Sequence, residues 1–411
     1  MWFAIAIIFI GASIAHAVYF SRRITGAIEA LAPTTRRYLR PARRVYLAIA
    51  CSLPLLILLY IVYVLVAQPT TVGLPEGTVA DVLLVFPYLF VTIWSFQTSL
   101  LIVPIGALHW LVRRTGRLEA QPWHRRRHIA VLCIAAVFLV YVPARFAIDG
   151  RSLEVRQHDI RIPDLASDLD GFAIALLADP QADRHTGPER IGELVDAVLK
   201  ANPDLIVVAG DIITRDPAYI EVAAAQLGRL KAGHGVYACI GDHDNFAYSD
   251  QERSLREVRE GIGSRGIAML DNEQVAIRVG ESELALVLVT NNYINRIGPG
   301  TARKLVERAR DAAVRVVVAH QAGSELVAQA QRAGAEVFLS GHTPGGQVNF
   351  WTPFGSLIFS RIESPYVTGR YEIGDMALIV SSGLGMSVTP FRYRSSATVD
   401  IIRLRRGQGR N

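Results

Sequence analysis

The chain has 411 residues, which is enough for two domains, and 51% of them are hydrophobic. The net charge of +6 arises in the first 150 residues, which hold 14 Arg, no Lys and 5 acidic residues, whereas the remainder holds 29 basic and 32 acidic residues. This distribution argues against a nucleic-acid partner, which would need a basic patch on the folded part, and the three cysteines define no disulfide framework.

Four long apolar stretches lie in residues 1–150. They are Trp2–Phe20, Val45–Ala67, a stretch within 82–112, and His128–Val142. Each is close to the roughly 20 residues that cross a bilayer as a helix, so a four-helix transmembrane region is predicted rather than a set of buried soluble helices. An AHA sequence at 15–17 resembles a signal-peptide cleavage site. However, no basic residue precedes the first stretch and two arginines follow it, which favours a retained helix.

Arginines between the apolar stretches predict the orientation of the helices. The segment 21–44 carries seven Arg and the segment 113–127 carries six, whereas 68–78 carries none. Because positively charged loops stay in the cytoplasm, the amino terminus and residues 151–411 are predicted to lie outside it, with the chain integral to the inner or cell membrane. A second crossing within 82–112 would reverse this orientation.

Residues 151–411 form the second predicted domain, in which strand-like and helix-like runs alternate. Predicted strands are 172–179, 204–211, 235–242, 283–290, 314–320 and 336–342, and predicted helices are 188–200, 217–231, 250–265, 300–312 and 324–333. Strands rich in Val, Ile and Leu that alternate with helices indicate a buried, largely parallel sheet.

Carboxylates and imidazoles stand at the predicted carboxyl ends of five of these strands. They are Asp179, Asp211, Asp242 with His243, His320 and His342. In open α/β sheets, ligands bind in the crevice outside these ends. A single Asp at such a position could simply cap the next helix, but five strand ends of this kind indicate one common site.

The order of these residues resembles the calcineurin-like metallophosphoesterase superfamily. The matching motifs are Asp179-Pro180-Gln181, Gly210-Asp211, Gly241-Asp242-His243-Asp244, His320, and Gly341-His342-Thr343-Pro344. The segments "SGHTPGGQV" at 340–348 and "YVTGRYEIGDMALIVSSGLGMS" at 366–387 are similar to a membrane-attached bacterial branch. The resemblance covers about residues 155–405 and implies a four-layer α-β-β-α sandwich. The fold class expected for the chain is therefore α/β, preceded by an all-α membrane region.

The resemblance implies phosphoester hydrolysis with two divalent cations about 3.5–4 Å apart. The metal ligands that it implies are Asp211 on both cations, Asp242, His320 and His342 on the second, and Asp179 and Gln181 beside the first. It also implies that His243 lies near the leaving oxygen, as an acid or an electrostatic stabiliser. Asp244 would then hold the His243 ring in one tautomer.

Three residues depart from the family's pattern. Asp242 replaces an Asn, and a carboxylate binds hard cations at least as well as an amide. Gln181 replaces a His, as also occurs in the manganese-dependent ADP-ribose/CDP-alcohol phosphatases, and its oxygen favours Mn²⁺ or Mg²⁺, with Zn²⁺ or Fe as alternatives. Pro344 replaces the last His and offers no side-chain ligand, so the first metal site is expected to be weak. Asp183 and His185 either compensate for this loss or are solvated loop residues.

The leading hypothesis is a membrane-anchored metallophosphoesterase, a hydrolase of a phosphomonoester or phosphodiester. The membrane tether suggests a phosphorylated lipid or an envelope precursor as the substrate. The alternative is a degenerate domain that binds a ligand or partner without turnover, which Pro344 supports. A transporter or sensor is disfavoured, because intramembrane charges usually mark ion paths and the single candidate, His109, lies near the end of a span.

Two further features remain open. The segment 349–360, "NFWTPFGSLIFS", is either an apolar rim that meets lipid or a hairpin packed on the core. Candidates for bidentate contact with a phosphate are Arg361, Arg370, Arg392 and Arg394.

Overall fold

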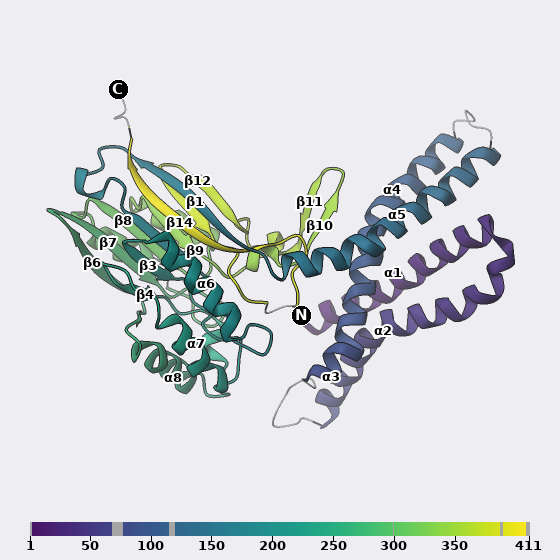
Figure 1. Cartoon of the computed structure of the whole chain (residues 1–411), viewed down its shortest axis with the longest axis horizontal. Helices are drawn as coiled ribbons and strands as arrows, with labels where there is room; N and C mark the ends of the chain where they lie inside the picture. Colours follow the sequence, from purple (N-terminus) through teal and green to yellow (C-terminus); the bar gives the residue numbers. More distant parts are fainter. Residues whose placement is uncertain (1, 68–76, 115–119, 299, 387–388, 408–411) are drawn as a thin grey trace. The chain divides into compact units, whose positions relative to one another are not determined.

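The computed structural model describes residues 2–67, 77–114, 120–298, 300–386 and 389–407 (Figure 1). Contacts within the chain divide it into two compact units. We call them the helical unit, residues 1–147 with 350–357, and the sheet unit, residues 148–349 with 358–411. A short segment from late in the sequence therefore belongs with the helices.

The helical unit consists mainly of the long helices α1 (Trp2–Leu31), α2 (Arg36–Ala67), α4 (Phe86–Arg114) and α5 (Ala120–Asp149), with the short elements η1 (Pro33–Thr35), α3 (Thr78–Ala80) and η2 (Asp81–Val85). Within the described residues, four segments are long and apolar enough to cross a membrane: Ile7–Leu31, Pro33–Tyr63, Thr78–Leu111 and Trp123–Asp149. The four predicted helices are confirmed in this respect, and the long third stretch is one candidate span. Residues 68–76 of the predicted loop without arginine, and Arg117, lie outside the described residues.

Aromatic side chains pack inside the helical unit. The rings of Phe20 and Trp94 meet edge to face, 5.0 Å apart, and Trp94 Nε1 donates to the carbonyl of Ala135 at 2.8 Å. The hairpin formed by β10 (Asn349–Thr352) and β11 (Gly355–Ile358) joins this unit through Phe350, whose ring lies 4.7 Å from that of Phe96. The aromatic segment therefore does form a hairpin, but residues 350–357 pack with the helices rather than on the core of the predicted second domain.

The first sheet of the sheet unit has six strands in the order β1-β14-β2-β3-β4-β5. Their bounds are β1 (Leu153–Ile162), β14 (Ala397–Arg406), β2 (Ala173–Leu177), β3 (Leu205–Val208), β4 (Val236–Ala238) and β5 (Ala268–Met269). All neighbours are parallel except β14 and β2. The helices α6 (Pro188–Ala201), α7 (Ala218–Leu227) and α8 (Gln251–Gly263) share one buried cluster with this sheet, to which Leu194 and Ile206 belong.

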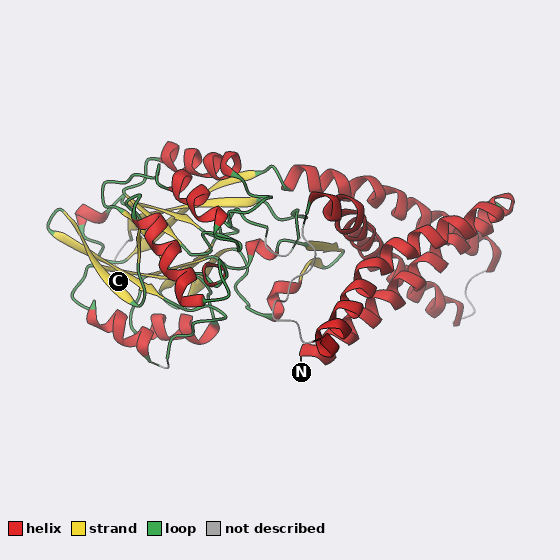
Figure 2. Ribbon diagram, turned by 90° about the horizontal axis from the view of Figure 1, so that it is seen from below, coloured by secondary structure: helices red, strands yellow, loops and turns green. Residues whose placement is uncertain are grey.

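The second sheet has the order β12-β13-β9-β8-β7-β6. Its strands are β12 (Gly369–Ile373), β13 (Met376–Val380), β9 (Val337–Ser340), β8 (Val314–Ala319), β7 (Ser282–Val289) and β6 (Glu273–Val279). The helices α9 (Thr301–Arg308) and α10 (Ser324–Arg332) pack on one face of it. Leu176 of β2 and Leu286 of β7 share the cluster between the two sheets. The helices lie outside the strands (Figure 2), which confirms the predicted four-layer arrangement.

Strands end earlier than the sequence predicts. β2 ends at Leu177 and β3 at Val208, so the motif carboxylates lie in the loops beyond them. Asp179 and Asp211 have φ angles of 47° and 57°, in the left-handed region that a strand cannot accommodate. Non-glycine residues pay a cost for this conformation, and such strain clusters at functional sites.

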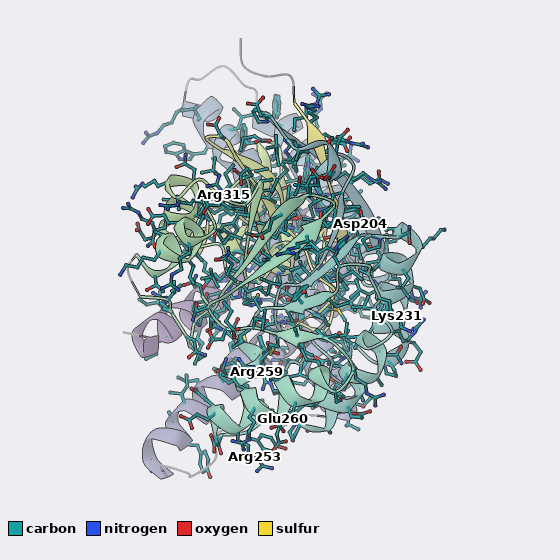
Figure 3. The ribbon with its side chains drawn as sticks, turned by 90° about the vertical axis from the view of Figure 1, so that its left-hand side faces the viewer. Asp204, Lys231, Arg253, Arg259, Glu260 and Arg315 are labelled. Carbon is teal, nitrogen blue, oxygen red and sulfur yellow. The ribbon has the colours of Figure 1, made fainter. Side chains whose placement is uncertain are left out.

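Exterior charges of the sheet unit form ordinary surface pairs. Arg315, which is half-buried, pairs with Glu336. Arg253 Nε, on the exterior, lies 2.7 Å from the Glu257 carboxylate one helical turn away. Both arginines are labelled in Figure 3. Exposed pairs of this kind contribute about 0.2–1 kcal/mol each. The buried ionisable residues are therefore the ones that need a separate explanation.

Candidate metal centre

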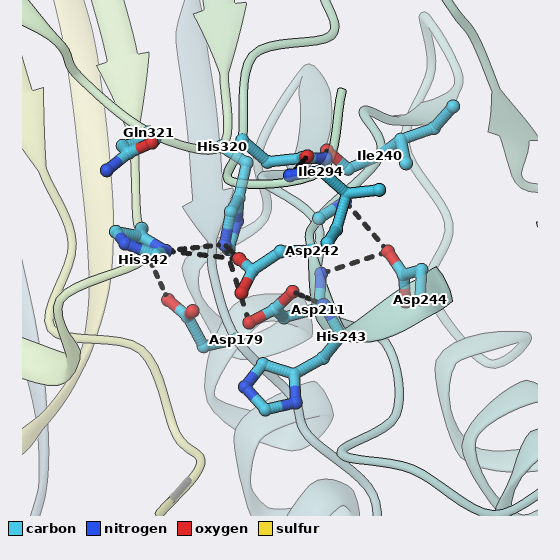
Figure 4. A network of polar contacts seen from close by, with 12 residues as sticks. Asp179, Asp211, Ile240, Asp242, His243, Asp244, Ile294, His320, Gln321 and His342 are labelled. Carbon is cyan, nitrogen blue, oxygen red and sulfur yellow. Dashed lines mark hydrogen bonds and ion pairs between the residues drawn. The ribbon is translucent and has the colours of Figure 1, made fainter. Parts of the chain in front are cut away.

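Loops from both sheets bring the predicted residues together (Figure 4). Asp179 follows β2, Asp211 follows β3 and Asp242 follows β4, whereas His320 follows β8 and His342 follows β9. The carboxyl ends of parallel strands meet at one edge of a sheet. The three carboxylates of one sheet therefore converge with the two imidazoles of the other.

The second cluster consists of Asp242, His320 and His342, whose ligand atoms lie within 4.8 Å of one another. Asp242 Oδ1 lies 2.9 Å from His320 Nε2 and 3.2 Å from His342 Nδ1. His320 Nδ1 lies 2.7 Å from the carbonyl oxygen of Ala209, which turns Nε2 toward the carboxylates. The chemistry of this donor set, two imidazoles and a carboxylate, is that of a transition-metal or zinc site.

The first cluster consists of Asp179, Asp211 and His320, again within 4.8 Å. Gln181 adjoins it, because its Nε2 donates to Asp211 Oδ2 at 3.0 Å. Asp179 Oδ1 and Gln181 Oε1 are both buried and have no hydrogen-bond partner among the described residues. Buried acceptors of this kind need a donor or a cation. Two carboxylates and an amide oxygen suit a hard divalent cation, so the residues present fit one.

Burial and mutual contact shift the pKa values of the ionisable groups in the two clusters. Burial raises the pKa of Asp179 to about 6, against the opposing charge of His320. Burial alone would raise the pKa of Asp242, but hydrogen bonds from His320 and His342 lower it below its ordinary value. Burial favours the neutral form of His342, yet its bonds to Asp242 and Glu363 raise its pKa to about 9. Closely packed groups with opposing shifts are typical of functional sites.

The expected contact between Asp244 and His243 is not made. Asp244 accepts backbone N–H bonds from Asp211 at 3.1 Å, Ile212 at 2.8 Å and Gly241 at 2.8 Å. His243 Nδ1 lies instead 2.7 Å from the carbonyl oxygen of Thr214. Both residues lie in a short 3₁₀ turn, His243–Asn245, in which successive side chains point to different sides. Asp244 therefore holds the loops that carry Asp211 and Asp242, and burial raises its pKa to about 7.

Asp183 and His185 are not brought into either cluster. Asp183 Oδ1 accepts the backbone N–H of His185 and of Thr186, both at 2.7 Å, and Oδ2 accepts the Thr214 hydroxyl at 2.9 Å. These bonds account for both oxygens, so Asp183 stabilises its own loop. Pro344 lies in a buried turn, where its carbonyl oxygen accepts from Ser395 Oγ at 3.0 Å.

Glu363 is a site residue that the sequence did not indicate. Its Oε1 lies 2.6 Å from His342 Nε2 and accepts from Gln321 Nε2 at 2.7 Å. Burial would raise the pKa of Glu363, but the hydrogen bonds from His342 and Tyr293 lower it. Glu363 follows a 3₁₀ turn rather than a strand, so the strand-end pattern could not have found it.

Arg392 is buried and binds the loops around the first cluster. Its guanidinium donates to the carbonyl oxygens of Ser382 at 2.9 Å, Gly383 at 3.0 Å and Gly385 at 2.9 Å. It also donates to that of Pro344 at 3.2 Å. These bonds make it a structural residue rather than the phosphate ligand considered from the sequence.

Close packing of the loop that contains Gly383 and Gly385 requires glycine at both positions. The backbone N–H of Gly385 donates to the carbonyl oxygen of Asp179 at 2.7 Å. A Cβ at Gly385 would lie 2.2 Å from Gln181 Oε1, and one at Gly383 would lie 2.7 Å from Asp179 Oδ2. Only glycine lets this loop approach both candidate ligands so closely.

Comparison with known proteins shows similarity to one family and to several relatives. The sequence model of the calcineurin-like phosphoesterase family matches residues 172–346. A transmembrane protein with metallophosphoesterase domain from Danio rerio is 26% identical over 68% of this chain and 63% of its own length. The chain therefore matches less than two thirds of that relative.

Bacterial relatives are similar at the same level. The uncharacterized metallophosphoesterase YkuE of Bacillus subtilis is 25% identical over 64% of this chain and 90% of its own length. The phosphodiesterase YaeI of Escherichia coli is 26% identical over 52% of this chain and 75% of its own length. Residues 172–346 thus match the calcineurin-like phosphoesterase family, and they follow four helices long and apolar enough to span a membrane.

Proposed function

We propose that this protein is a membrane-anchored, metal-dependent phosphoesterase that hydrolyses a phosphomonoester or a phosphodiester. The strongest support is the pair of clusters that meet at His320, with Asp211 3.4 Å from His320 Nε2. Asp179 Oδ1 and Gln181 Oε1 add two buried acceptors that no described donor satisfies. An arrangement of this kind suits two neighbouring divalent cations.

The two clusters share His320, and the resemblance to the family adds Asp211 as a carboxylate shared by the two proposed cations. Asp211 would contribute to both cations, with Asp242, His320 and His342 on the second and with Asp179 and Gln181 on the first. Cations held there would supply Lewis-acid polarisation of the phosphoryl group and activation of water. Because Gln181 offers an oxygen where an imidazole would offer nitrogen, the first site is expected to prefer Mn²⁺ or Mg²⁺.

His243 is the proposed proton donor or electrostatic stabiliser for the leaving oxygen. The Thr214 carbonyl oxygen lies 2.7 Å from His243 Nδ1 and accepts a hydrogen bond from it. That bond fixes the ring and leaves Nε2 as the nitrogen that exchanges a proton with the substrate. The backbone N–H of His243 also donates to Asp211 Oδ1 at 2.9 Å. His243 is thereby held against the proposed shared ligand.

The membrane anchor supports a substrate at the membrane. We propose a phosphorylated lipid or an envelope precursor, hydrolysed outside the cytoplasm. The arginine-rich loops 21–44 and 113–127 support this orientation, because such loops stay in the cytoplasm.

Substitution of the shared carboxylate tests the proposal. The full-length protein, purified in detergent and depleted of metal, would be assayed on a chromogenic phosphomonoester and phosphodiester with added Mn²⁺, Mg²⁺ or Zn²⁺. Asp211→Asn should lower kcat by orders of magnitude, because both cations lose an anionic ligand. Asn tolerates the left-handed backbone of this position. Asp216→Asn is the matched control, since Asp216 is exposed and also has a positive φ of 76°.

The alternative is a degenerate domain that binds a phosphorylated ligand without turnover. The absence of a side-chain ligand at Pro344 favours it. Metal binding without hydrolysis of either substrate, at millimolar Mn²⁺, would support this alternative and exclude the enzyme.

A further inference from the structure

A polar side chain buried in the helical unit binds the edge of the hairpin 350–357. Gln97 of α4 donates from Nε2 to the Trp351 carbonyl oxygen at 2.8 Å. Its Oε1 accepts the Trp351 backbone N–H at 2.9 Å. The amide thus satisfies both backbone groups of Trp351, in the way that a neighbouring strand would.

The Thr352 side chain satisfies two backbone groups at the tip of the hairpin. The Thr352 hydroxyl accepts the backbone N–H of Phe354 at 3.2 Å and donates to the Gly355 carbonyl oxygen at 2.8 Å. Pro353, between them, has no N–H to satisfy. A backbone whose polar groups are paired internally avoids the cost of several kcal/mol that each unpaired group would have in lipid.

The side chains of the hairpin are mostly apolar, and none is charged. Its sequence is FWTPFGSL, without a charged residue. Phe350 is buried against Phe96, whereas Phe354 at the tip is 96% exposed and Trp351 is 39% exposed. An almost fully exposed phenylalanine on a water-facing turn would be unfavourable, but aromatic rings are enriched where a protein meets the membrane interface.

We propose that the hairpin 350–357 is a lipid-contacting element, with the ring of Phe354 inserted among the acyl chains and with Gln97 holding the hairpin to α4. The occupant is lipid because the hairpin packs within the same unit as the four candidate membrane helices. This proposal rests on the membrane anchoring stated under Proposed function and does not depend on the phosphoesterase reaction.

The hairpin lies between two residues of the candidate site along the chain. His342 precedes it and Glu363, whose carboxylate contacts His342 Nε2, follows it. The hairpin and these two residues therefore belong to one continuous segment of the chain.

Site-specific photo-crosslinking tests the proposal. A benzoylphenylalanine probe would be placed at Phe354 of the full-length protein, reconstituted in vesicles of phosphatidylcholine and phosphatidylglycerol. Irradiation should yield a lipid adduct, detected by intact mass, several-fold more often than the same probe at Phe246. Phe246 is the matched control, because it is an exposed phenylalanine of the sheet unit, 39% accessible. Equal adduct yields at the two positions, or crosslinks only to a second copy of the chain, would overturn the proposal.

The role of Gln97 is tested with the same probe. Gln97→Leu removes both hydrogen bonds to Trp351 and should reduce the lipid adduct at Phe354 several-fold. Thr98→Ala is the control, because the Thr98 hydroxyl donates to the carbonyl of Trp94 within α4 and not to the hairpin. An unchanged adduct in Gln97→Leu would show that Gln97 does not hold the hairpin. Hydrolysis of a soluble phosphodiester is measured in parallel, so that failure of the enzyme proposal is distinguished from failure of this one.

Discussion

Glu363 Oε1 lies 2.6 Å from His342 Nε2, while Nδ1 of the same ring lies 3.2 Å from Asp242 Oδ1. The imidazole is therefore held on one side by a carboxylate and presents its other nitrogen to the second cluster. Partners of this kind fix the tautomer of a ligating histidine and raise its basicity. Glu363 is thus a positioning residue for the proposed metal ligand.

Removal of the Glu363 carboxylate should weaken metal binding at the second cluster. Glu363→Ala is expected to lower affinity at the second cluster by about 10–100-fold, whereas Glu363→Gln should lose less, because its amide oxygen still accepts from Nε2. Calorimetric titration with Mn²⁺ measures the metal affinity of both variants. Gln321→Ala is the control, since Gln321 contacts Glu363 but not His342. Equal affinity in Glu363→Ala and the unsubstituted protein would refute the positioning role.

Metal removal should destabilise the sheet unit. Cations that bind the folded protein stabilise it by about 2.7 kcal/mol when their free concentration is 100 times Kd. Thermal unfolding should therefore shift to lower temperature with a chelator and recover with Mn²⁺ or Mg²⁺. The shift should be smaller in Asp211→Asn, which loses a ligand in the proposed arrangement. A transition that none of Mn²⁺, Mg²⁺ and Zn²⁺ moves would contradict the metal assignment.

The sequence predicted the part of the site that follows buried strands. Runs of Val, Ile and Leu mark β2, β3, β8 and β9, and the next polar residues, such as Asp179 and His320, converge for that reason. Side-chain direction inside a turn was not predictable. Asp244 and His243 are adjacent in sequence, yet they bind different loops. Both lie in a 3₁₀ turn, in which successive side chains point to different sides. The packing of the hairpin with the helices was also not predictable, because Gln97 and Trp351 are 254 residues apart in sequence.

Arg392 should be required both for the stability of the folded protein and for metal binding at the first cluster. Arg392→Met leaves five carbonyl oxygens without this donor, and buried acceptors left unsatisfied cost about 1–3 kcal/mol each. Arg392→Lys should fall between, because an ammonium cannot span the same fork of acceptors. Denaturant unfolding measures the loss of stability, and metal titration measures the loss of metal binding at the first cluster. Arg370→Met, on an exterior arginine bonded to Glu372, should leave both unchanged. If Arg392→Met binds metal normally, Arg392 has no role in positioning the first cluster.

The orientation of the chain in the membrane can be tested with topology reporters fused to it. A fusion after Asn411 should be active with alkaline phosphatase, which works only outside the cytoplasm, and dark with a fluorescent protein that folds only inside. The reason is the excess of arginine in the segments 21–44 and 113–127. A fusion placed at residue 30 should give the opposite pair of signals. If the carboxyl-terminal fusion reports the cytoplasm, the number of crossings differs from four or the arginines do not determine the orientation.

Restoring the two missing imidazoles distinguishes a weak enzyme from a binding domain. Pro344 contributes its carbonyl oxygen to Ser395 and Arg392 through the backbone, so Pro344→His leaves those acceptors in place. Gln181 lies against Gly385, and an imidazole there would take the position of the amide. The double variant, Gln181→His with Pro344→His, should bind the weaker cation more than about ten-fold tighter, because each imidazole adds a metal bond.

The two hypotheses then differ in turnover. If the native protein is an enzyme with a weak first site, its hydrolysis should rise with Mn²⁺ over the range in which the second ion binds, and the double variant should reach the same rate at lower Mn²⁺. The variant should also accept Zn²⁺ more readily, since imidazole nitrogen suits that ion better than an amide oxygen. A binding domain predicts one ion in the native protein and no turnover at any Mn²⁺ concentration. Hydrolysis that appears only after both histidines are restored would therefore identify Gln181 and Pro344 as the residues that separate binding from catalysis.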